Sequence, residues 1–296
     1  MPEELPDNRL QGDTPLRQAQ FVMLRLLKAF HGICERNGLR YWLDAGTLLG
    51  AVRHGGFIPW DDDVDVLMPK EDYDRFVGIA AAELPFDMFF QTPRTDPGFS
   101  CPWVKIRDRY SHLVEETGPY PYSQAIFIDV FPAVKETERQ HAFRNFYSLL
   151  PPLSKRPELP ERSLPLKSNL KRALFGAAQY AFIGVTKIKP IGRAVAAWFE
   201  KGDRAWAYEP PIRWRNRFPD EVVFPLKDIR FEDAEFHGPA DPHRYLSDYF
   251  GDYMKPPPEE QRKSEHAVGA IYPTGPNPHW SGLAWDERHN GKAGSK

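Results

Sequence analysis

A run of acidic residues set between apolar ones is the first feature of the sequence that could do chemistry. It spans residues 60–66 and reads WDDDVDV. In a strand, side chains two residues apart project from the same face, so Asp63 and Asp65 would lie side by side. Two such charges repel unless a cation neutralises them, and carboxylate oxygens suit Mg²⁺ or Mn²⁺. The run therefore predicts a metal site that also binds substrate phosphate, with a solvated acidic turn as the alternative.

A glycine–threonine pair lies upstream of the acidic run. Gly46 and Thr47 stand between an alternating segment and an apolar one, which predicts a turn from a strand into a helix. Free backbone N–H groups and the helix dipole at such a turn favour phosphate. Arg53 follows in the same predicted helix, and arginine can bind phosphate through two hydrogen bonds. These three residues are the candidate phosphate-binding residues of this segment.

Two cations share one face of a later predicted strand. Lys105 and Arg107 alternate with apolar residues, so both side chains would project from the same side. They could neutralise a diphosphate, and a solvated face explains them equally well. Asp129 lies within the apolar segment 125–131, where a lone carboxylate is often a hydrogen-bonded core residue.

The elements that must position these side chains follow from periodicity and from helix caps. Thr14 as a cap, apolar residues at spacings of three and four, and Gly38 as a stop predict a helix over 14–37. A helix is also expected over 70–84. The pattern indicates an α+β fold with a mixed sheet flanked by helices, and a helical C-terminal extension. Strands are expected at 39–43, 63–68, 87–91, 103–108, 112–116 and 125–131.

A stretch rich in proline and serine predicts a boundary after the core. We expect a catalytic core over 1–150, a mainly helical and irregular region over 151–280, and a flexible tail over 281–296. Within the middle region, helices are expected at about 167–208 and 242–253. The short apolar segment within 171–189 has flanking lysines and would suit a peripheral membrane contact, with a buried or partner-facing helix as the alternative.

Composition narrows the class of partner and compartment. The chain has 296 residues, 39 Lys and Arg against 41 Asp and Glu, and a formal net charge of −2. Without a global basic field, nucleic acid is not the expected partner. Cys34 and Cys101 form no disulfide framework or zinc spacing, and the N-terminus lacks the pattern of a secretory signal. We expect a cytoplasmic protein.

The glycine–threonine turn followed by an Asp-apolar-Asp strand is the arrangement of the nucleotidyltransferase fold. The full run over 43–66, LDAGTLLGAVRHGGFIPWDDDVDV, closely resembles the LicD family, the phosphocholine transferases that include the fukutin-related ribitol-phosphate transferases. The segment FIDVFP over 127–132 is similar to the family's second acidic strand, which would make Asp129 the third active-site carboxylate and metal ligand. The segment over 245–254 resembles the family's C-terminal Tyr-Gly-Asp segment, and we assign it no catalytic role.

The resemblance implies a specific reaction. LicD-like enzymes move the alcohol-phosphate half of a CDP-alcohol to a sugar hydroxyl, so that CMP leaves. By this resemblance the chain would be a Mg²⁺-dependent phosphotransferase that modifies a cell-surface glycan such as lipopolysaccharide or capsule. Its partners would be a CDP-alcohol donor and a glycan or lipid-linked sugar acceptor, met at the inner face of the membrane. The alternatives are transfer of a nucleoside monophosphate, a glycosyltransferase with an Asp-x-Asp metal site, and a non-enzymatic metal-binding scaffold.

Overall fold

The computed structural model describes residues 5–114, 121–148, 188–212, 214, 216–264, 270–275 and 277–280. The chain divides into two compact units. Unit 1 comprises Met1–Val134 and Asp220–Lys296, and unit 2 comprises Lys135–Pro219, so that unit 2 is an insertion in the sequence of unit 1. The expected boundary at residue 150, most of the segment 171–189 and the tail 281–296 lie outside the described residues, and the expected domain division stays a prediction.

The central sheet of unit 1 is mixed. Across the sheet, the strands are β1 (Trp42–Leu43), β2 (Asp65–Pro69), β6 (Phe127–Thr137), β4 (Val104–Asp108) and β3 (Met88–Gln91). β2 and β6 run parallel, whereas the other neighbours in this order are antiparallel. The predicted α+β class with a mixed sheet is thereby confirmed.

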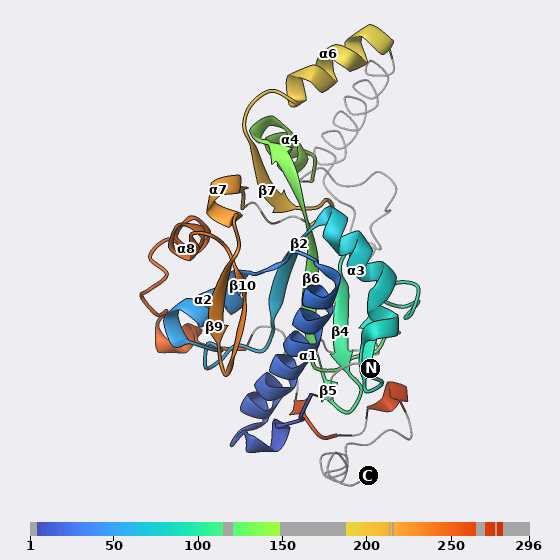
Figure 1. Cartoon of the computed structure of the whole chain (residues 1–296), viewed down its shortest axis with the longest axis vertical. Helices are drawn as coiled ribbons and strands as arrows, with labels where there is room; N and C mark the ends of the chain where they lie inside the picture. Colours follow the sequence, from blue (N-terminus) through green and yellow to red (C-terminus); the bar gives the residue numbers. More distant parts are fainter. Residues whose placement is uncertain are drawn as a thin grey trace, which may run out of the picture. The chain divides into compact units, whose positions relative to one another are not determined.

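Two helices pack on this sheet, α1 (Pro15–Asn37) and α3 (Lys70–Glu83). Thr14 caps α1 by accepting a hydrogen bond from the Arg17 N–H, and Gly38, at φ 58°, ends it. α1 contacts β4 and α3, and α3 contacts β2 and β3 (Figure 1). The apolar side of α1, with Leu26, Leu27 and Phe30 fully or almost fully buried, forms much of the core. Both helices confirm the sequence prediction.

A second group of elements lies beside β1. It consists of α2 (Ala45–His54), the hairpin β9 (Lys227–Phe231) to β10 (Ala234–Gly238), and α8 (Pro242–Phe250). α2 contacts α8 and β9, and β10 contacts β1 (Figure 1). The hairpin is absent from the sequence prediction, and its turn contains Glu232 in the left-handed region at φ 58°. α8 confirms a helix beginning at Pro242, but it ends at Phe250, three residues before Tyr253, and Gly251 follows with φ 71°.

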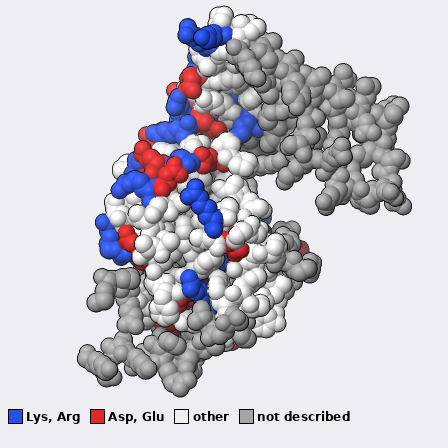
Figure 2. All heavy atoms as spheres, turned by 90° about the vertical axis from the view of Figure 1, so that its right-hand side faces the viewer, with Lys and Arg blue, Asp and Glu red and all other residues white. Residues whose placement is uncertain are grey.

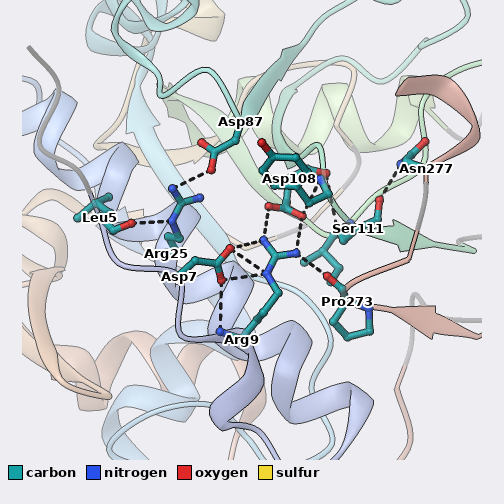
Figure 3. A network of polar contacts seen from close by, with 11 residues as sticks. Leu5, Asp7, Arg9, Arg25, Asp87, Asp108, Ser111, Pro273 and Asn277 are labelled. Atoms are coloured by element: carbon teal, nitrogen blue, oxygen red, sulfur yellow. Dashed lines mark hydrogen bonds and ion pairs between the residues drawn. The ribbon is translucent and has the colours of Figure 1, made fainter. Parts of the chain in front are cut away.

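A buried arginine joins the two ends of unit 1 to its middle. Arg9, in a short 3-10 helix, is fully buried and donates hydrogen bonds to Asp7, to Asp108 and to the carbonyl oxygen of Pro273 (Figure 3). Its Nη2 lies 2.8 Å from Oδ1 of Asp108, at the end of β4. Burial alone would lower the pKa of Arg9, but the charges of Asp108 and Asp7 raise it.

The remaining short elements of unit 1 are η1 (Arg9–Gln11), β5 (His112–Leu113), which pairs with β11 (Ile271–Tyr272), α7 (Asp220–Val223), η2 (Glu259–Gln261) and η3 (Pro278–Trp280).

Unit 2 contains strands as well as helices. Its described elements are the end of β6, α4 (Glu138–Ser148), α6 (Lys189–Phe199), β7 (Arg204–Tyr208), which pairs with β6, and β8 (Phe218–Pro219), which pairs with β7. The helix expected up to Tyr208 is wrong in its last part, because Ala205 and Ala207 are buried members of a strand. Among the described residues, none of the helices has the length and apolar character needed to cross a bilayer.

Charged side chains of both signs are interspersed on the face shown in Figure 2. Several exposed charges in unit 1 form ion pairs, such as Lys70 with Asp74 and Arg36 with Glu83. Pairs of this kind contribute little to stability because solvent screens them.

Candidate active site

The parallel ladder between β2 and β6 brings two of the predicted carboxylates together. Asp65 and Asp129 are paired in register, and the Asp129 N–H donates to the carbonyl oxygen of Val64 at 2.8 Å. Residues paired in register on adjacent strands project from the same face. The two carboxylates thus lie side by side although 64 positions separate them in the sequence (129 − 65). Sequence periodicity alone could not establish this neighbour.

The acidic run precedes β2 rather than lying within it. β2 begins at Asp65, two positions later than predicted. Burial nevertheless alternates over 61–66: Asp61, Asp63 and Asp65 are partly exposed, whereas Asp62 is buried with an exposed fraction of 3%. Asp62 therefore faces the opposite side of the segment from the other three carboxylates.

Several negative charges converge at this end of the sheet. The pKa of Asp65 is raised well above its usual value, first by burial and then by the charges of Asp63, Asp129, Asp44 and Asp61. Burial also raises the pKa of Asp129, against the opposing effects of Lys105 and Trp103. Carboxylates that disfavour one another's charge are a donor set that a hard divalent cation satisfies. By the chemistry of their oxygens, Asp63, Asp65 and Asp129 would suit such an ion.

Asp129 is held by two donors. Trp103 Nε1 donates to Oδ1 at 2.7 Å, and Lys105 Nζ donates to Oδ2 at 3.1 Å. Lys105 is buried and lies 3.3 Å above the centre of the Phe127 ring. The lysine therefore occupies the acidic site and does not line a solvated face. Trp103, which has no predicted hydrogen-bonding role, becomes a site residue through this contact.

Arg107 does not join the carboxylates. It is fully buried, and it donates to the carbonyl oxygen of Ala125 at 2.7 Å and to the side chain of Gln91. The antiparallel register pairs it with Phe127, two positions before Asp129. A solvated face is excluded for Arg107 as well, and its observed contacts are to neighbouring strands and their connections.

The first turn of α2 is attached to the acidic segment. The Thr47 hydroxyl accepts a hydrogen bond from the Asp65 N–H at 2.9 Å, and the Asp44 N–H donates to the Asp65 carbonyl at 3.0 Å. A Cβ added to Gly46 would lie 2.9 Å from Oδ2 of Asp61, so a larger residue here would displace the Asp61 carboxylate. Gly46 and Thr47 thus bring the helix N-terminus against the carboxylates.

Arg53 lies at the other end of α2, among residues from the C-terminal part of unit 1. Its Nη1 donates to the carbonyl oxygen of Tyr253 at 2.7 Å. Burial and the nearby charge of Arg262 lower the pKa of Arg53. Arg262 lies over the ring of Trp60, 5.3 Å from its centre, directly before the acidic run. Two guanidinium groups therefore lie close together near one end of that run.

A buried tyrosine from α8 supports the turn. The Tyr245 hydroxyl donates to Asp44 Oδ1 at 2.6 Å and accepts a hydrogen bond from Trp42 Nε1 at 3.1 Å. Asp44 and Tyr245 are both fully buried. No catalytic role is expected for the segment 245–254, and its resemblance to a family segment is the sequence signal that points to it. The tyrosine acts by positioning the start of α2.

The amino-acid sequence of the chain is similar to a family of known proteins. A family model described as "LicD/FKTN/FKRP, nucleotidyltransferase domain" matches residues 38–158, which include every carboxylate of the site. The lipopolysaccharide cholinephosphotransferase LicD of Haemophilus influenzae is 28% identical over 267 residues, covering 85% of this chain and 96% of that protein. The mouse ribitol 5-phosphate transferase FKRP is 50% identical over 81 residues, which are 24% of this chain and 16% of that protein. The chain is thus similar to the LicD family, through the nucleotidyltransferase domain matched at residues 38–158 and through a cholinephosphotransferase over 85% of its length.

Proposed function

We propose that the chain is a metal-dependent phosphotransferase that moves an alcohol-phosphate group, of the phosphocholine type, from a CDP-alcohol to a sugar hydroxyl of a cell-surface glycan. The registered pair of Asp65 and Asp129 is the observation that carries the proposal, because it brings two acidic segments together where their carboxylates would share one cation. The similarity to a lipopolysaccharide cholinephosphotransferase and to a ribitol 5-phosphate transferase supports the class of reaction.

The residues divide the work between charge neutralisation and proton transfer. Asp63, Asp65 and Asp129 would hold Mg²⁺ or Mn²⁺, which when bound acts as a Lewis acid on phosphate oxygens. Lys105, at 3.1 Å from Asp129, adds a positive charge inside the buried site. The acceptor oxygen bonds to the phosphorus that carries the alcohol, the bridging P–O bond breaks, and CMP leaves. Asp129 has two alternative roles in this step: it would coordinate a second cation, or it would remain outside the metal site and take the proton of the acceptor hydroxyl.

The remaining predicted residues take supporting roles in this proposal. Gly46 and Thr47 present the N-terminus of α2, where backbone N–H groups favour phosphate. Arg53, together with Arg262, would contact the donor's phosphates or the acceptor. Arg107 stabilises β4 through Gln91 and Ala125 and so holds Lys105 in place.

The direct test measures products with a panel of donors. The purified chain would be incubated with Mg²⁺, CDP-choline, CDP-ribitol and CDP-glycerol, and with glycan extracts as acceptors. Mass spectrometry should detect CMP and a glycan heavier by one alcohol phosphate. The Asp65→Asn variant serves as the inactive control.

Other products would identify the alternatives. Release of pyrophosphate and attachment of a nucleoside monophosphate would indicate nucleotidyl transfer. Transfer of a sugar from a nucleotide sugar would indicate a glycosyltransferase. Metal binding without turnover on any donor would indicate a scaffold protein. Each of these outcomes contradicts the proposed phosphotransferase.

A further inference from the structure

Two histidines and a glutamate meet on the side of α1 that faces the β9–β10 hairpin. His31 and Glu35 are four residues apart on α1, so they lie on one face, one turn from each other. His237 comes from β10. One potential ligand atom from each residue lies within 4.8 Å of the others, and Nε2 of His237 is 2.8 Å from Oε1 of Glu35. Among the described residues, these three side chains form the group that offers two histidine nitrogens and a carboxylate oxygen close enough together to hold a metal ion.

The hydrogen bonds around the two imidazoles orient them. Nδ1 of His31 is 2.8 Å from the hydroxyl of Tyr41, which leaves Nε2 as the ring nitrogen for a ligand. Nδ1 of His237 is 3.1 Å from Oδ1 of Asp228, on β9, and Nε2 points to Glu35. A carboxylate on the distal nitrogen of a histidine is the usual support for a metal-binding imidazole, because it fixes the tautomer and the ring orientation.

The two imidazoles lie against each other and against one tyrosine. The rings of His31 and His237 are 5.5 Å apart between centres, and each also contacts the ring of Tyr41. The exposed fraction of the Glu35 side chain is 54%, so an ion could enter from solvent.

We propose that His31, Glu35 and His237 form a second metal site, selective for a transition ion of the Zn²⁺ class. Two imidazoles and one carboxylate are the ligands of many three-residue zinc sites, with water in the fourth position. Tetrahedral ligands of zinc are separated by about 3.4 Å, within the range these atoms span. Imidazole disfavours Mg²⁺, so this site would take a different ion from the carboxylate site. The bound ion would join α1 to the hairpin.

Calorimetric titration with Zn²⁺ tests the proposal. The chelator-treated chain, in buffer with excess Mg²⁺ to occupy the carboxylates, should bind one equivalent of Zn²⁺. His31→Gln and His237→Gln should weaken this binding by at least ~100-fold, since each removes a direct ligand. Asp228→Asn, which keeps the shape but removes the supporting charge, should weaken it by about 10–100-fold. The exposed His279, outside the cluster, supplies the matched control, and His279→Gln should bind like wild type.

Two further variants keep the result interpretable. Because Glu35 is exposed, Glu35→Gln should fold normally and lose the affinity, even if a histidine variant is unstable. Asp65→Asn should retain the Zn²⁺ equivalent, which separates this site from the proposed catalytic one. Equal Zn²⁺ affinity in wild type, Glu35→Gln and both histidine variants, or loss of binding only in Asp65→Asn, would overturn the proposal. Melting temperatures with and without Zn²⁺ should give the same ranking.

Discussion

The aspartates at positions 61, 62, 63 and 65 do not all lie on the same side of their segment. Asp63 and Asp65 lie on the side of the candidate carboxylate site, whereas Asp62 is buried on the other side. We expect Asp63→Ala and Asp65→Ala to abolish transfer without lowering the melting temperature, because each removes a proposed ligand and relieves repulsion. Asp62→Ala should instead lower stability with near-normal kcat. Equal loss of kcat in all three variants would contradict this arrangement.

Asp129→Asn tests the third carboxylate. The variant keeps the shape but removes the negative charge next to Lys105. We expect kcat to fall by at least ~10²-fold, while nucleotide affinity stays within about tenfold. Because the amide nitrogen must face either the Trp103 N–H or the Lys105 ammonium group, stability should also fall, by about 1–3 kcal/mol. A normal kcat in steady-state assays would remove Asp129 from the reaction.

At the residue scale, the sequence identifies the carboxylates of the candidate site, but it does not identify the residues that Lys105 and Arg107 contact. The period of two places Lys105 and Arg107 on one face, and both side chains are indeed buried near neighbouring strands. Their different roles depend on cross-strand register, which pairs Lys105 with Asp129 and Arg107 with Phe127. Register arises from tertiary structure, so local pattern cannot predict it.

At the scale of elements, α8 supports the start of α2 through the hydrogen bonds of one tyrosine. Tyr245→Phe removes the hydroxyl that bonds to both Asp44 and Trp42. Because both partners are then left buried without this bond, we expect a loss of about 1–3 kcal/mol in the free energy of unfolding. Tyr272→Phe changes an exposed tyrosine and should have no measurable effect in the same denaturant titration. Equal stability of the two variants would show that α8 does not support the turn.

A pH-dependent contact joins α1 to the hairpin. Burial opposes the charge of Glu232, but hydrogen bonds from Arg17 and from the Phe57 N–H lower its pKa below 4.5. A lowered folded-state pKa contributes stability above the unfolded value, and the contribution disappears as the pH falls through the folded value. Glu232→Gln should therefore lower stability by about 1–2 kcal/mol at pH 7, for a partly exposed pair.

The difference between wild type and Glu232→Gln should shrink below about pH 4.5, as the wild-type carboxylate takes up a proton. Glu235→Gln, an exposed substitution on the same hairpin, is the control and should show no such dependence. Thermal melts between pH 3 and pH 7 provide the measurement. A constant difference across this range would mean that the charge of Glu232 does not stabilise the contact.

Elements with local signals are predictable, whereas elements defined by distant contacts are not. α1 begins after Thr14 and ends at Gly38, as predicted, because its caps are encoded in adjacent residues. The sequence carries no clear hairpin signal at β9–β10, because the turn uses Glu232 at positive φ, where the usual signal is glycine or asparagine. The predicted helix extends over β7, where Ala205 and Ala207 favour helix, but the pairing of β7 with β6 overrides that preference.

On the scale of the whole of unit 1, Arg9 holds the two chain ends against β4. Arg9→Leu would leave the buried carboxylate of Asp108 without its charge partner. We expect a loss of about 3–5 kcal/mol in the free energy of unfolding, measured by urea titration. Arg36→Leu, which breaks an exposed pair with Glu83, should change stability by less than about 1 kcal/mol. Similar small losses for both variants would contradict a role for Arg9 in joining the ends.

The insertion of unit 2 into the sequence of unit 1 also sets the order in which the site is completed during synthesis. All carboxylates of the candidate site have left the ribosome once Asp129 has emerged, but Tyr245, which supports Asp44, follows 116 positions later (245 − 129). At usual translation rates this interval is roughly 10 s. During that time the carboxylates lack α8 and the β9–β10 hairpin, and unit 2 is the part being made. The proposed catalytic centre would therefore be completed late, after translation of the C-terminal elements, although its proposed metal ligands are encoded early.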